Sequence, residues 1–482
     1  MTIAQNAEYS QEVPLSSQGQ ARAEAGKQME PFEKNSSNAY DPVHNPNGII
    51  SLALAENTLL HKELADYFER HFHLTYSDFT YGSLRGDLRL REALSWVINA
   101  YFHPFENVTP NHLIMGNGLV SLVSHLAGAV ANRGDGILVA KPFYYGWDIE
   151  LPLLHGVVPV GVPVPISDMF TLAEVTYFEK MLQESNKKGI KIKAVFVCNP
   201  HNPYGRAYPR DVIIEYSRFC EKHNLHLISD EIYALSTFPS LDIPRPQPFV
   251  SALSIDLKAH GVNPSRVHVL YGISKDFNCN GFRIGALITQ HNQSLIQSMT
   301  SIACLMVVSS PASALWTSLL TDNKSLTHFL TLNKFKLQAA YTHLTTWLKF
   351  HNLPYLPSSA GHFLLVDMRP ILSNTRRYGT LLTITDDQDM YEREVTLDRF
   401  LFARGVQLRQ GSMCHMDNGW FRISFTIERN YLNLALARVE DAMGWERWSE
   451  LRPRKHIKDE PLKVNIRVSF QPHDGISSLE LL

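Results

Sequence analysis

Between residues 136 and 289 the chain alternates short apolar segments with segments of helical periodicity. A helix is expected at 211–223, because Val212, Tyr216 and Phe219 fall on one face at helical spacing. Alternation of this kind is typical of an α/β fold, in which helices cover both faces of a mostly parallel sheet. Ligands of such sheets bind at the carboxyl ends of the strands. The expected strands are 136–140, 157–164, 193–198, 225–229, 267–271 and 284–289.

The segments on either side of this core have a different composition and predict further units. Residues 1–38 are rich in Gln, Ser, Ala and Glu without apolar periodicity, which predicts a mobile N-terminal tail. Residues 111–130 are expected to form a loop and then a long apolar helix that begins near Gly118. The expected units are an N-terminal arm with part of a small domain (39–80), a large domain (81–321), a small α+β domain (322–446) and a C-terminal extension (447–482).

Within the small domain, residues 329–348 are expected to be helical, and 363–367, 406–409 and 421–425 to be strands. The C-terminal extension carries a charged run at 452–460 and then a segment, 463–470, that alternates like a strand.

The overall composition excludes several functional classes. With 44% hydrophobic and 19% charged residues and a net charge of -2, the 482-residue chain is unsuited to nucleic acid or an anionic membrane as main partner. The sequence shows no membrane-spanning apolar run and no secretory signal. Five scattered cysteines without a CxxC pair predict free thiols and a cytoplasmic location. No histidine pair has metal-binding spacing, so no metal site is expected.

A single lysine, Lys275, follows the expected strand 267–271 directly after Ser274, and Arg283 comes eight residues later. A lysine beside other positive charge has a lowered pKa and can form a Schiff base with an aldehyde. Pyridoxal phosphate is the cofactor that uses such a lysine, and an arginine fork would hold its phosphate. Alone, this stretch is equally consistent with a surface lysine and an ion-paired arginine.

Polar residues also follow two neighbouring expected strands. Asn202, in Asn-Pro-His-Asn-Pro, follows strand 193–198, and Asp230 and Tyr233 follow strand 225–229. In isolation Asn202 is typical of a turn and Asp230 of a helix N-cap. A pyridoxal site, however, needs a buried carboxylate at the ring nitrogen and neutral donors at the ring hydroxyl. These three residues would supply both.

Four motifs occur along the chain in this order: Asn-Pro-x-Asn-Pro, Ser-Asp-Glu-Ile-Tyr, Ser-Lys and Gly-Phe-Arg-Ile-Gly. With them the chain resembles the class I/II aminotransferase superfamily (fold type I) over roughly residues 40–445. The resemblance implies a large domain with a seven-stranded, mostly parallel sheet and a smaller α+β domain. It implies that Lys275 carries pyridoxal 5'-phosphate and that Asp230 pairs with the ring nitrogen. Asn202 and Tyr233 would hold the ring oxygen, and Tyr144 would stack on the ring, with Tyr145 as the alternative.

The same resemblance assigns further residues. Gly118 and Leu119 would hold the phosphate on backbone amides at a helix N-terminus. Tyr81 matches the tyrosine that such enzymes lend to the neighbouring subunit's phosphate, so a homodimer with a shared active site is implied. Arg422 matches the arginine that binds the substrate α-carboxylate bidentately.

A narrower resemblance is to the 1-aminocyclopropane-1-carboxylate (ACC) synthase branch and its fungal relatives, which include C–S lyases and presumed aminotransferases of secondary metabolism. It is carried by Asn45 to Ile50, by Leu54-Ala55-Glu56-Asn57, by the stretch from Phe219-Cys220-Glu221-Lys222-His223 through Tyr233-Ala234 and by Gly419-Trp420-Phe421-Arg422. Glu56 matches the glutamate that helps place S-adenosylmethionine in the synthases. The implied reaction is elimination at a carbon–sulfur bond of an α-amino acid, with Lys275 and Tyr233 as catalytic residues. Amino-group transfer to a keto acid is the alternative, and a non-catalytic pyridoxal-binding scaffold is a distant one.

The sequence departs from the family pattern at two positions. Gly272 stands where a serine is usual, and Leu119 stands where threonine or serine is frequent. Two hydroxyl ligands of the phosphate are therefore expected to be missing, with Ser121 or a water as a candidate replacement. The expectation that follows is that Gly272→Ser tightens cofactor binding if the turn accepts a side chain.

Overall fold

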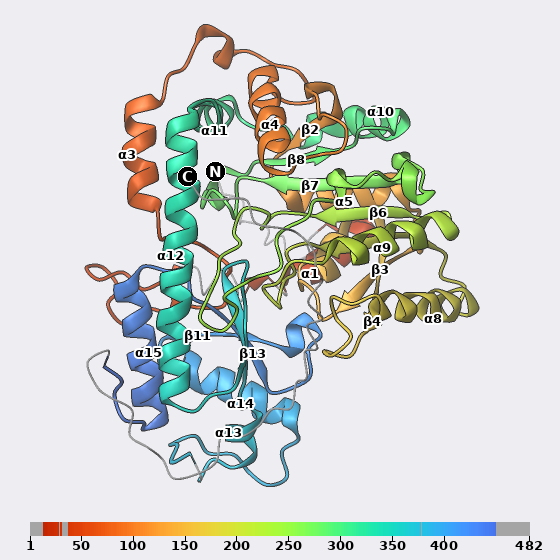
Figure 1. Cartoon of the computed structure of the whole chain (residues 1–482). Coiled ribbons are helices and arrows are strands. Elements are labelled where there is room, and N and C mark those ends of the chain that lie inside the picture. Colours follow the sequence, from red (N-terminus) through yellow and green to blue (C-terminus); the bar gives the residue numbers. More distant parts are fainter. Residues whose placement is uncertain (1–12, 28, 31–36, 377, 450–482) are drawn as a thin grey trace, which may run out of the picture.

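The computed structural model describes residues 13–27, 29–30, 37–376 and 378–449. It has two parts, which Figure 1 shows above and below one another: a large seven-stranded sheet covered by helices, and a smaller four-stranded sheet. Helix α12 (Asn323–Phe350) runs along both parts. The charged run at 452–460 and the expected strand at 463–470 lie outside the described residues.

The seven-stranded sheet has the order β2-β8-β7-β6-β5-β3-β4. The pairs β3–β4, β3–β5, β5–β6 and β6–β7 are parallel, whereas β8 is antiparallel to both β7 and β2. This architecture confirms the expected α/β fold with a mostly parallel sheet. The strands are β2 (Leu113–Gly116), β3 (Gly136–Lys141), β4 (Val158–Pro163), β5 (Ile192–Cys198), β6 (His226–Asp230), β7 (Val267–Gly272) and β8 (Gly285–Ile288).

Strand β2 is a correction to the sequence analysis, which expected a loop before the helix near Gly118. The segment from Leu113 to Gly116 pairs residue by residue with β8 and closes one edge of the sheet. Its residues are all buried, so the segment shows no polar alternation that would mark it as a strand. Only its pairing with a strand distant in sequence makes it one.

Helices cover both faces of this sheet because successive strand residues point to opposite sides. In β5, Val195 and Val197 belong to one apolar cluster and Ala194 and Phe196 to another. The first cluster contains residues of α3 (His61–His71), α4 (Leu88–Tyr101), α8 (Ala173–Lys187), α9 (Arg210–Lys222) and α11 (Ser310–Thr321). The second contains residues of α5 (Leu119–Val130), α6 (Trp147–Glu150) and α10 (Gln293–Ile302) and lies beside α7 (Pro152–His155).

The smaller part is an antiparallel sheet of order β12-β13-β10-β9 with its own apolar core. The N-terminal segment contributes to this part, because Ile50 of β1 pairs with Val406 of β11. The four strands of the antiparallel sheet are β9 (Tyr355–Leu356), β10 (Phe363–Asp367), β12 (Arg409–Gln410) and β13 (Trp420–Ser424), and β1 (Ile50–Ser51) and β11 (Val406–Gln407) form a separate parallel pair. The helices of the smaller part are α13 (Arg369–Ser373), α14 (Met390–Phe402) and α15 (Arg429–Met443).

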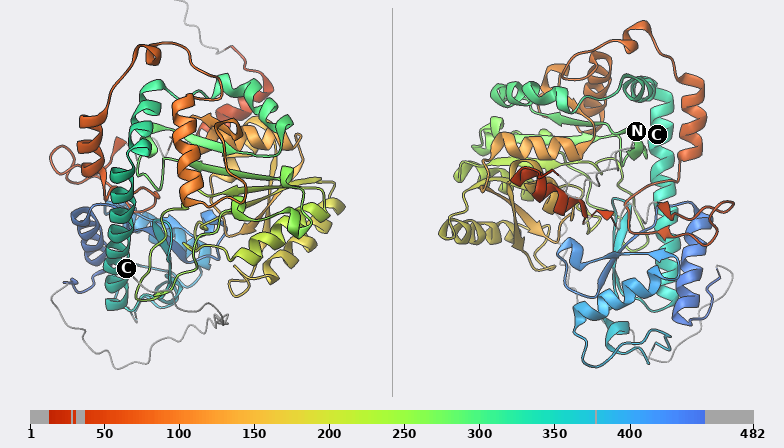
Figure 2. Two further views of the ribbon diagram at one scale, coloured as in Figure 1. Left: turned by 45° about the horizontal axis from the view of Figure 1, so that its top comes forward. Right: turned by 180° about the vertical axis from the view of Figure 1, so that it is seen from behind.

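The N-terminal region contains helix α1 (Ser17–Lys27), which Figure 2 shows from behind in its right-hand view. The sequence analysis expected only a mobile tail here and missed this helix. Residues such as Ala, Gln, Arg and Glu favour helix without any apolar stripe, and α1 accordingly has no buried residue. In the described ranges no helix is both long and apolar enough to span a membrane.

Candidate active site

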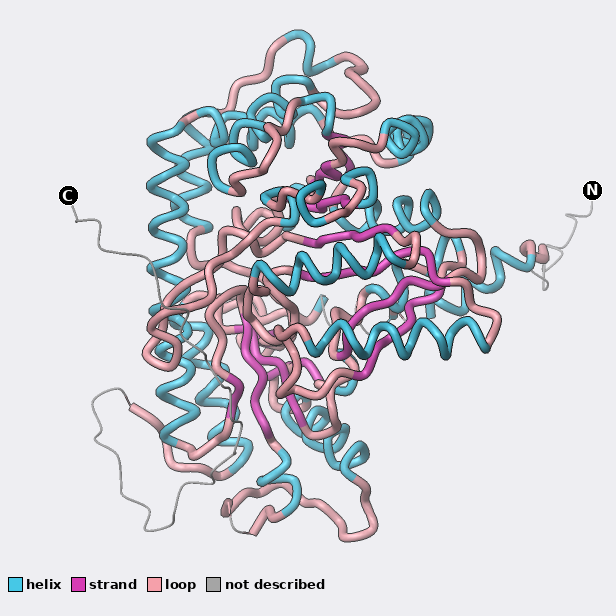
Figure 3. Tube along the Cα trace, turned by 45° about the vertical axis from the view of Figure 1, so that its right-hand side comes forward, coloured by secondary structure: helices cyan, strands magenta, loops and turns pink. Residues whose placement is uncertain are grey.

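A cavity of about 350 Å³ lies where strands β5, β6 and β7 end and the smaller sheet approaches them. Figure 3 shows the loops that follow these strands gathered beside the smaller sheet. The cavity brings together residues from segments far apart in sequence. Nominated residues that line it are Glu56, Leu119, Tyr144, Tyr145, Asn202, Asp230, Tyr233, Ser274, Lys275, Arg283 and Arg422.

Lys275 lies just beyond the end of β7, and its amino group donates a hydrogen bond to the Ala55 carbonyl at 2.6 Å. Burial lowers its pKa to about 8, and the positive charge of Arg422 adds to this effect. Glu56 and Asp230 oppose the shift because their negative charge favours the ammonium form. A substantial fraction of neutral amine is therefore present near neutral pH, and a neutral amine is the nucleophilic form.

Asp230 is the last residue of β6 and is only 8% exposed. Its hydrogen-bond partner among the described residues is the Ile232 backbone amide, at 3.2 Å. Burial raises its pKa to about 7, while that hydrogen bond and the charge of Lys275 act in the opposite direction. A buried carboxylate with so little compensation favours a cationic partner in the cavity. A protonated pyridine nitrogen is such a partner.

Arg422 of β13 is 2% exposed and forms part of the opposite wall. It donates to Asn202 Oδ1 at 2.9 Å and to the Ala53 carbonyl at 2.6 Å, and its buried Nε has no partner in the described structure. The guanidinium therefore keeps donor capacity for an anion. Tyr233 is buried, and burial raises its pKa well above the usual value, so it remains a neutral phenol that can donate a hydrogen bond.

The two candidate stacking residues differ in their surroundings. Tyr144 is close enough to Glu150 and Asp230 for their charges to raise its pKa further, after burial itself. Tyr145 lies against Arg409 instead, with the guanidinium carbon 4.4 Å from its ring centre. Tyr144 is thus the residue nearer to the expected ring-nitrogen partner.

Arg283 and the start of α5 form a candidate phosphate cradle. Gly118, with φ +104°, precedes the helix, and any Cβ there would overlap the Arg283 guanidinium. Only glycine therefore allows this arginine to approach the helix N-terminus. Arg283 itself adopts φ +54°, and its Nη1 donates to the Asn280 carbonyl at 2.6 Å. Backbone amides of a helix start and a guanidinium together suit a phosphate group.

The geometry overturns the expectation about Gly272. A Cβ on this residue would lie 2.6 Å from the Ile284 carbonyl oxygen and 2.9 Å from Leu119 Cδ1. A serine there collides with the backbone of β8, so Gly272→Ser is not expected to restore a phosphate ligand. Ser121 does not replace the missing hydroxyls either, because its own hydroxyl donates to the Gly118 carbonyl at 3.0 Å.

Two nominated residues are not among those that line the cavity: Gly118, which adjoins it between Leu119 and Arg283, and Tyr81. The side chain of Tyr81 is fully exposed, and so are large parts of Tyr76 and Phe79 nearby in sequence. Its assigned role concerns a neighbouring subunit, and a single chain does not test that role.

The sequence analysis missed several residues at or near the cavity because no motif marks them. Glu150 of α6 lines it and is buried; burial raises its pKa to about 8, and the charge of Asp230 adds to this. The Asn280 amide donates to Glu56 Oε1 at 2.6 Å and thereby orients that carboxylate. His362 is fully buried and stays neutral, because burial and then the charge of Lys275 lower its pKa to about 3. Their positions at or near the cavity follow from packing between segments that are distant in sequence.

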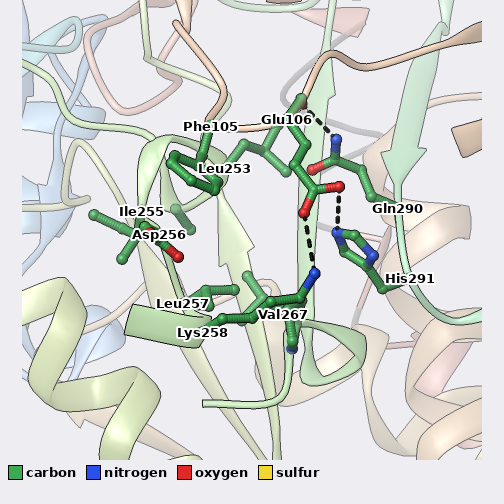
Figure 4. A pocket seen from close by; sticks show the side chains of 12 residues that line it. Phe105, Glu106, Leu253, Ile255, Asp256, Leu257, Lys258, Val267, Gln290 and His291 are labelled. Atoms are coloured by element: carbon green, nitrogen blue, oxygen red, sulfur yellow. Dashed lines mark hydrogen bonds and ion pairs between the residues drawn. The ribbon is translucent and has the colours of Figure 1, made fainter. Parts of the chain in front are cut away.

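Another cavity, drawn in Figure 4, is of a different kind. Its volume of about 30 Å³ has room for about one water molecule. Glu106 lies on its wall and forms an ion pair with Lys258 at 3.5 Å, which already compensates its charge, and it also lies 3.6 Å from the His291 ring nitrogen. Within the described ranges, no group of three or more His, Cys, Asp or Glu side chains is arranged to hold a metal ion.

Comparisons with known proteins agree with this geometry. The profile of the family "Aminotransferase class I and II" matches residues 48–439. The probable aminotransferase aclI of Aspergillus oryzae is 34% identical over 411 residues, which cover 82% of this chain and 91% of that protein. The 1-aminocyclopropane-1-carboxylate synthase 6 of Oryza sativa is 30% identical over 404 residues, covering 80% and 71%. The aspartate aminotransferase of Thermus thermophilus with maleate shares the fold, with a TM-score of 0.66, 21% identity and coverage of 90% and 100%.

Proposed function

The chain belongs to the class I and II aminotransferase family and is a pyridoxal-phosphate-dependent enzyme, and we propose that it catalyses elimination at a carbon–sulfur bond of an α-amino acid. The observation that carries this proposal is the single cavity in which Lys275, Asp230, Arg422 and Glu56 meet. When bound, pyridoxal phosphate supplies a ring that withdraws electrons from the substrate Cα.

The side chains that line the cavity have separate roles in binding the substrate, holding the cofactor and moving the Cα proton. Arg422 binds the substrate α-carboxylate through the guanidinium donors that the protein leaves free. Lys275, whose pKa is lowered to about 8, holds the cofactor and then takes the proton from Cα as a general base. With the cofactor bound, Asp230 would balance the positive charge at the ring nitrogen, and Tyr233 and Asn202 would donate hydrogen bonds to the ring oxygen. Arg283 and the start of α5 would hold the phosphate.

Glu56 supports elimination rather than plain transamination. Its carboxylate is held by the Asn280 amide at 2.6 Å and lies close enough to Lys275 to influence the pKa of that residue. A carboxylate there attracts a sulfonium or orients an amino group of the substrate side chain. In the proposed step the Cα proton moves to Lys275, the electron pair left on Cα forms a new bond to the carbon that carries the sulfur, and the sulfur leaves with the electron pair of the carbon–sulfur bond.

Amino-group transfer to a keto acid is the alternative, and the similarity to fungal probable aminotransferases favours it as the second candidate. Transamination would use the same Lys275 and Arg422 but does not require a carboxylate at the position of Glu56. A non-catalytic pyridoxal-binding scaffold is a distant third candidate, because a scaffold does not require a lysine with a lowered pKa.

We further propose that the active unit is a cytoplasmic homodimer. Exposed apolar side chains gather near Tyr81 in sequence, and Val120, which lines the cavity, is itself 48% exposed. The cavity therefore reaches the surface, where Tyr81 of a second copy can complete the phosphate site. The five cysteines are free, which supports a reducing compartment. Tyr81→Phe should weaken cofactor binding, and sedimentation should show a dimer.

The test of the reaction is a screen of amino acids with product analysis by mass spectrometry. Elimination releases a sulfur compound without any keto acid acceptor, whereas transamination requires the acceptor and yields an aminated product. Lys275→Ala is the control and should abolish both. Turnover that depends strictly on a keto acid would refute elimination, and borohydride labelling of a different lysine would refute the site.

A further inference from the structure

Arg409 of β12 lies beside the proposed active site and has no assigned task. It is the register partner of Arg422 in the antiparallel pair β12–β13. Side chains directly opposite one another in such a pair lie on the same face of the sheet. The face that presents Arg422 to the cavity therefore carries a second guanidinium next to it.

The contacts of Arg409 do not compensate its charge, although it is only 8% exposed. Nη1 lies 3.3 Å from Met413 Sδ, Nη2 lies 3.5 Å from the Tyr145 hydroxyl, and the buried Nε has no partner. In the described parts of the chain no carboxylate comes within 4.0 Å of this guanidinium. Asp398 is near enough for Arg409 to lower its pKa, which burial raises to about 6; this carboxylate forms no ion pair with Arg409 among the described residues and offsets only part of its charge from a distance. Buried charges in proteins are ordinarily paired, so a buried arginine without an ion pair favours the binding of an anion nearby.

Tyr145 connects Arg409 to the cavity, because it lines the cavity and its ring packs on the guanidinium with a separation of 4.4 Å. Its hydroxyl accepts from Arg409 Nη2, and its own hydrogen has no acceptor among the described residues. That hydrogen is free to be donated to a ligand. A ligand oxygen at this wall would meet both a hydroxyl donor and a nearby positive charge.

From this geometry we propose that Tyr145, positioned by Arg409, binds a second carboxylate, on the side chain of the substrate. The inference rests on the proposed function and narrows its substrate class to dicarboxylic amino acids. The α-carboxylate binds Arg422, and the second carboxylate accepts a hydrogen bond from the Tyr145 hydroxyl. Arg409 acts through Tyr145: it orients the ring, directs the hydroxyl hydrogen into the cavity and balances the carboxylate charge.

The test is a binding titration of the holoenzyme, followed through the visible absorbance of its cofactor. The probes are 2-methylglutamate and 2-methylaspartate, each with its neutral isostere, 2-methylglutamine or 2-methylasparagine. They lack the proton on Cα, so they bind without being consumed. The wild-type protein should bind at least one acid about tenfold or more tightly than its amide, as expected for a charge-assisted contact.

Substitutions assign this preference to the pair. Arg409→Met should reduce the acid-to-amide ratio to about 1 while amide binding changes less than about twofold, which also shows that the site is intact. Arg409→Lys should retain part of the preference, and Tyr145→Phe should reduce it because only the hydroxyl is lost. The exposed Arg404→Gln is the matched control and should leave the ratio unchanged.

Equal binding of acid and amide by the wild-type protein, or a full preference in Arg409→Met, would overturn the inference and leave the proposed function standing. If none of the four probes perturbs the cofactor absorbance, the inference is overturned; the proposed function is judged separately, by the release of a sulfur compound in the amino-acid screen.

Discussion

Replacing Gly272 by alanine or serine should destabilise the protein and weaken cofactor binding. Gly272 of β7 is the register partner of Gly285 in β8, and Leu119 Cδ1 fills the space beside both glycines. A Cβ on Gly272 would lie 2.6 Å from the Ile284 carbonyl oxygen, 2.9 Å from Leu119 Cδ1 and 3.1 Å from Gly285 Cα. Two of these contacts are with backbone inside a sheet, so they cannot be relieved by a change of rotamer.

The size of the effect follows from the cost of overpacking, which is typically about 1–3 kcal/mol. Gly272→Ala should therefore lower the urea midpoint of unfolding. Adding Leu119→Ala should recover only part of the loss, since the carbonyl contact at 2.6 Å remains. The distorted strand end also displaces Lys275, so the affinity for pyridoxal phosphate should fall, as measured by equilibrium titration of the cofactor-free protein.

Gly82→Ala is the matched control, because a Cβ there meets no atom within 4 Å and the residue has no positive φ. It should leave the midpoint unchanged. The reasoning is refuted if Gly272→Ser unfolds at the wild-type midpoint and binds the cofactor more tightly, since the hydroxyl would then be accommodated as a ligand.

Three further predictions concern the cavity. In the cofactor-free protein, acylation of Lys275, followed by peptide mass spectrometry, should show a midpoint near pH 8. Asp230→Asn should lower this midpoint, because the charge of Asp230 raises the pKa of the lysine. A midpoint near the ordinary pKa of lysine would contradict the argument that burial lowers the pKa. Arg422→Lys should raise KM for any α-amino acid by about tenfold or more because a point charge cannot replace a planar fork, and steady-state kinetics with an unchanged KM would place the carboxylate elsewhere. If the reaction is elimination, Glu56→Gln should reduce kcat/KM by about tenfold, which corresponds to about 1.4 kcal/mol, and the cofactor spectrum should stay normal. Unchanged activity together with free turnover of keto acids would favour transamination.

Local pattern was sufficient for the parts of the fold that depend on local chemistry. The apolar segments around 193–198, 225–229 and 267–271 are strands in the structure, because buried parallel strands are apolar throughout and end where polar residues begin. Since those strands are parallel neighbours, Asn202, Asp230 and Lys275 had to meet at one edge. That consequence of topology made most of the cavity predictable from residue order alone.

Pairing and packing over long distances decided the rest. Strand β2 exists because it pairs with β8, and Gly272 is a glycine because a carbonyl of the neighbouring strand and the Leu119 side chain occupy the space of a Cβ. Neither cause is visible in the residues on either side. Helix α1 shows the converse case, in which helix propensity exists without the apolar stripe that the pattern analysis requires.

The sequence by itself determined that a mostly parallel sheet forms, which apolar segments are its parallel strands and which polar residues follow their ends. The tertiary structure alone decided which charges are left uncompensated. Arg409 looks like an ordinary strand arginine in the sequence; the pairing of β12 with β13 places it beside Arg422, and packing against Tyr145 helps to bury it with no ion-paired carboxylate among the described residues. The physical reason is that burial and pairing of a charge depend on atoms brought from distant segments, whereas strand formation depends largely on the apolar character of neighbouring residues.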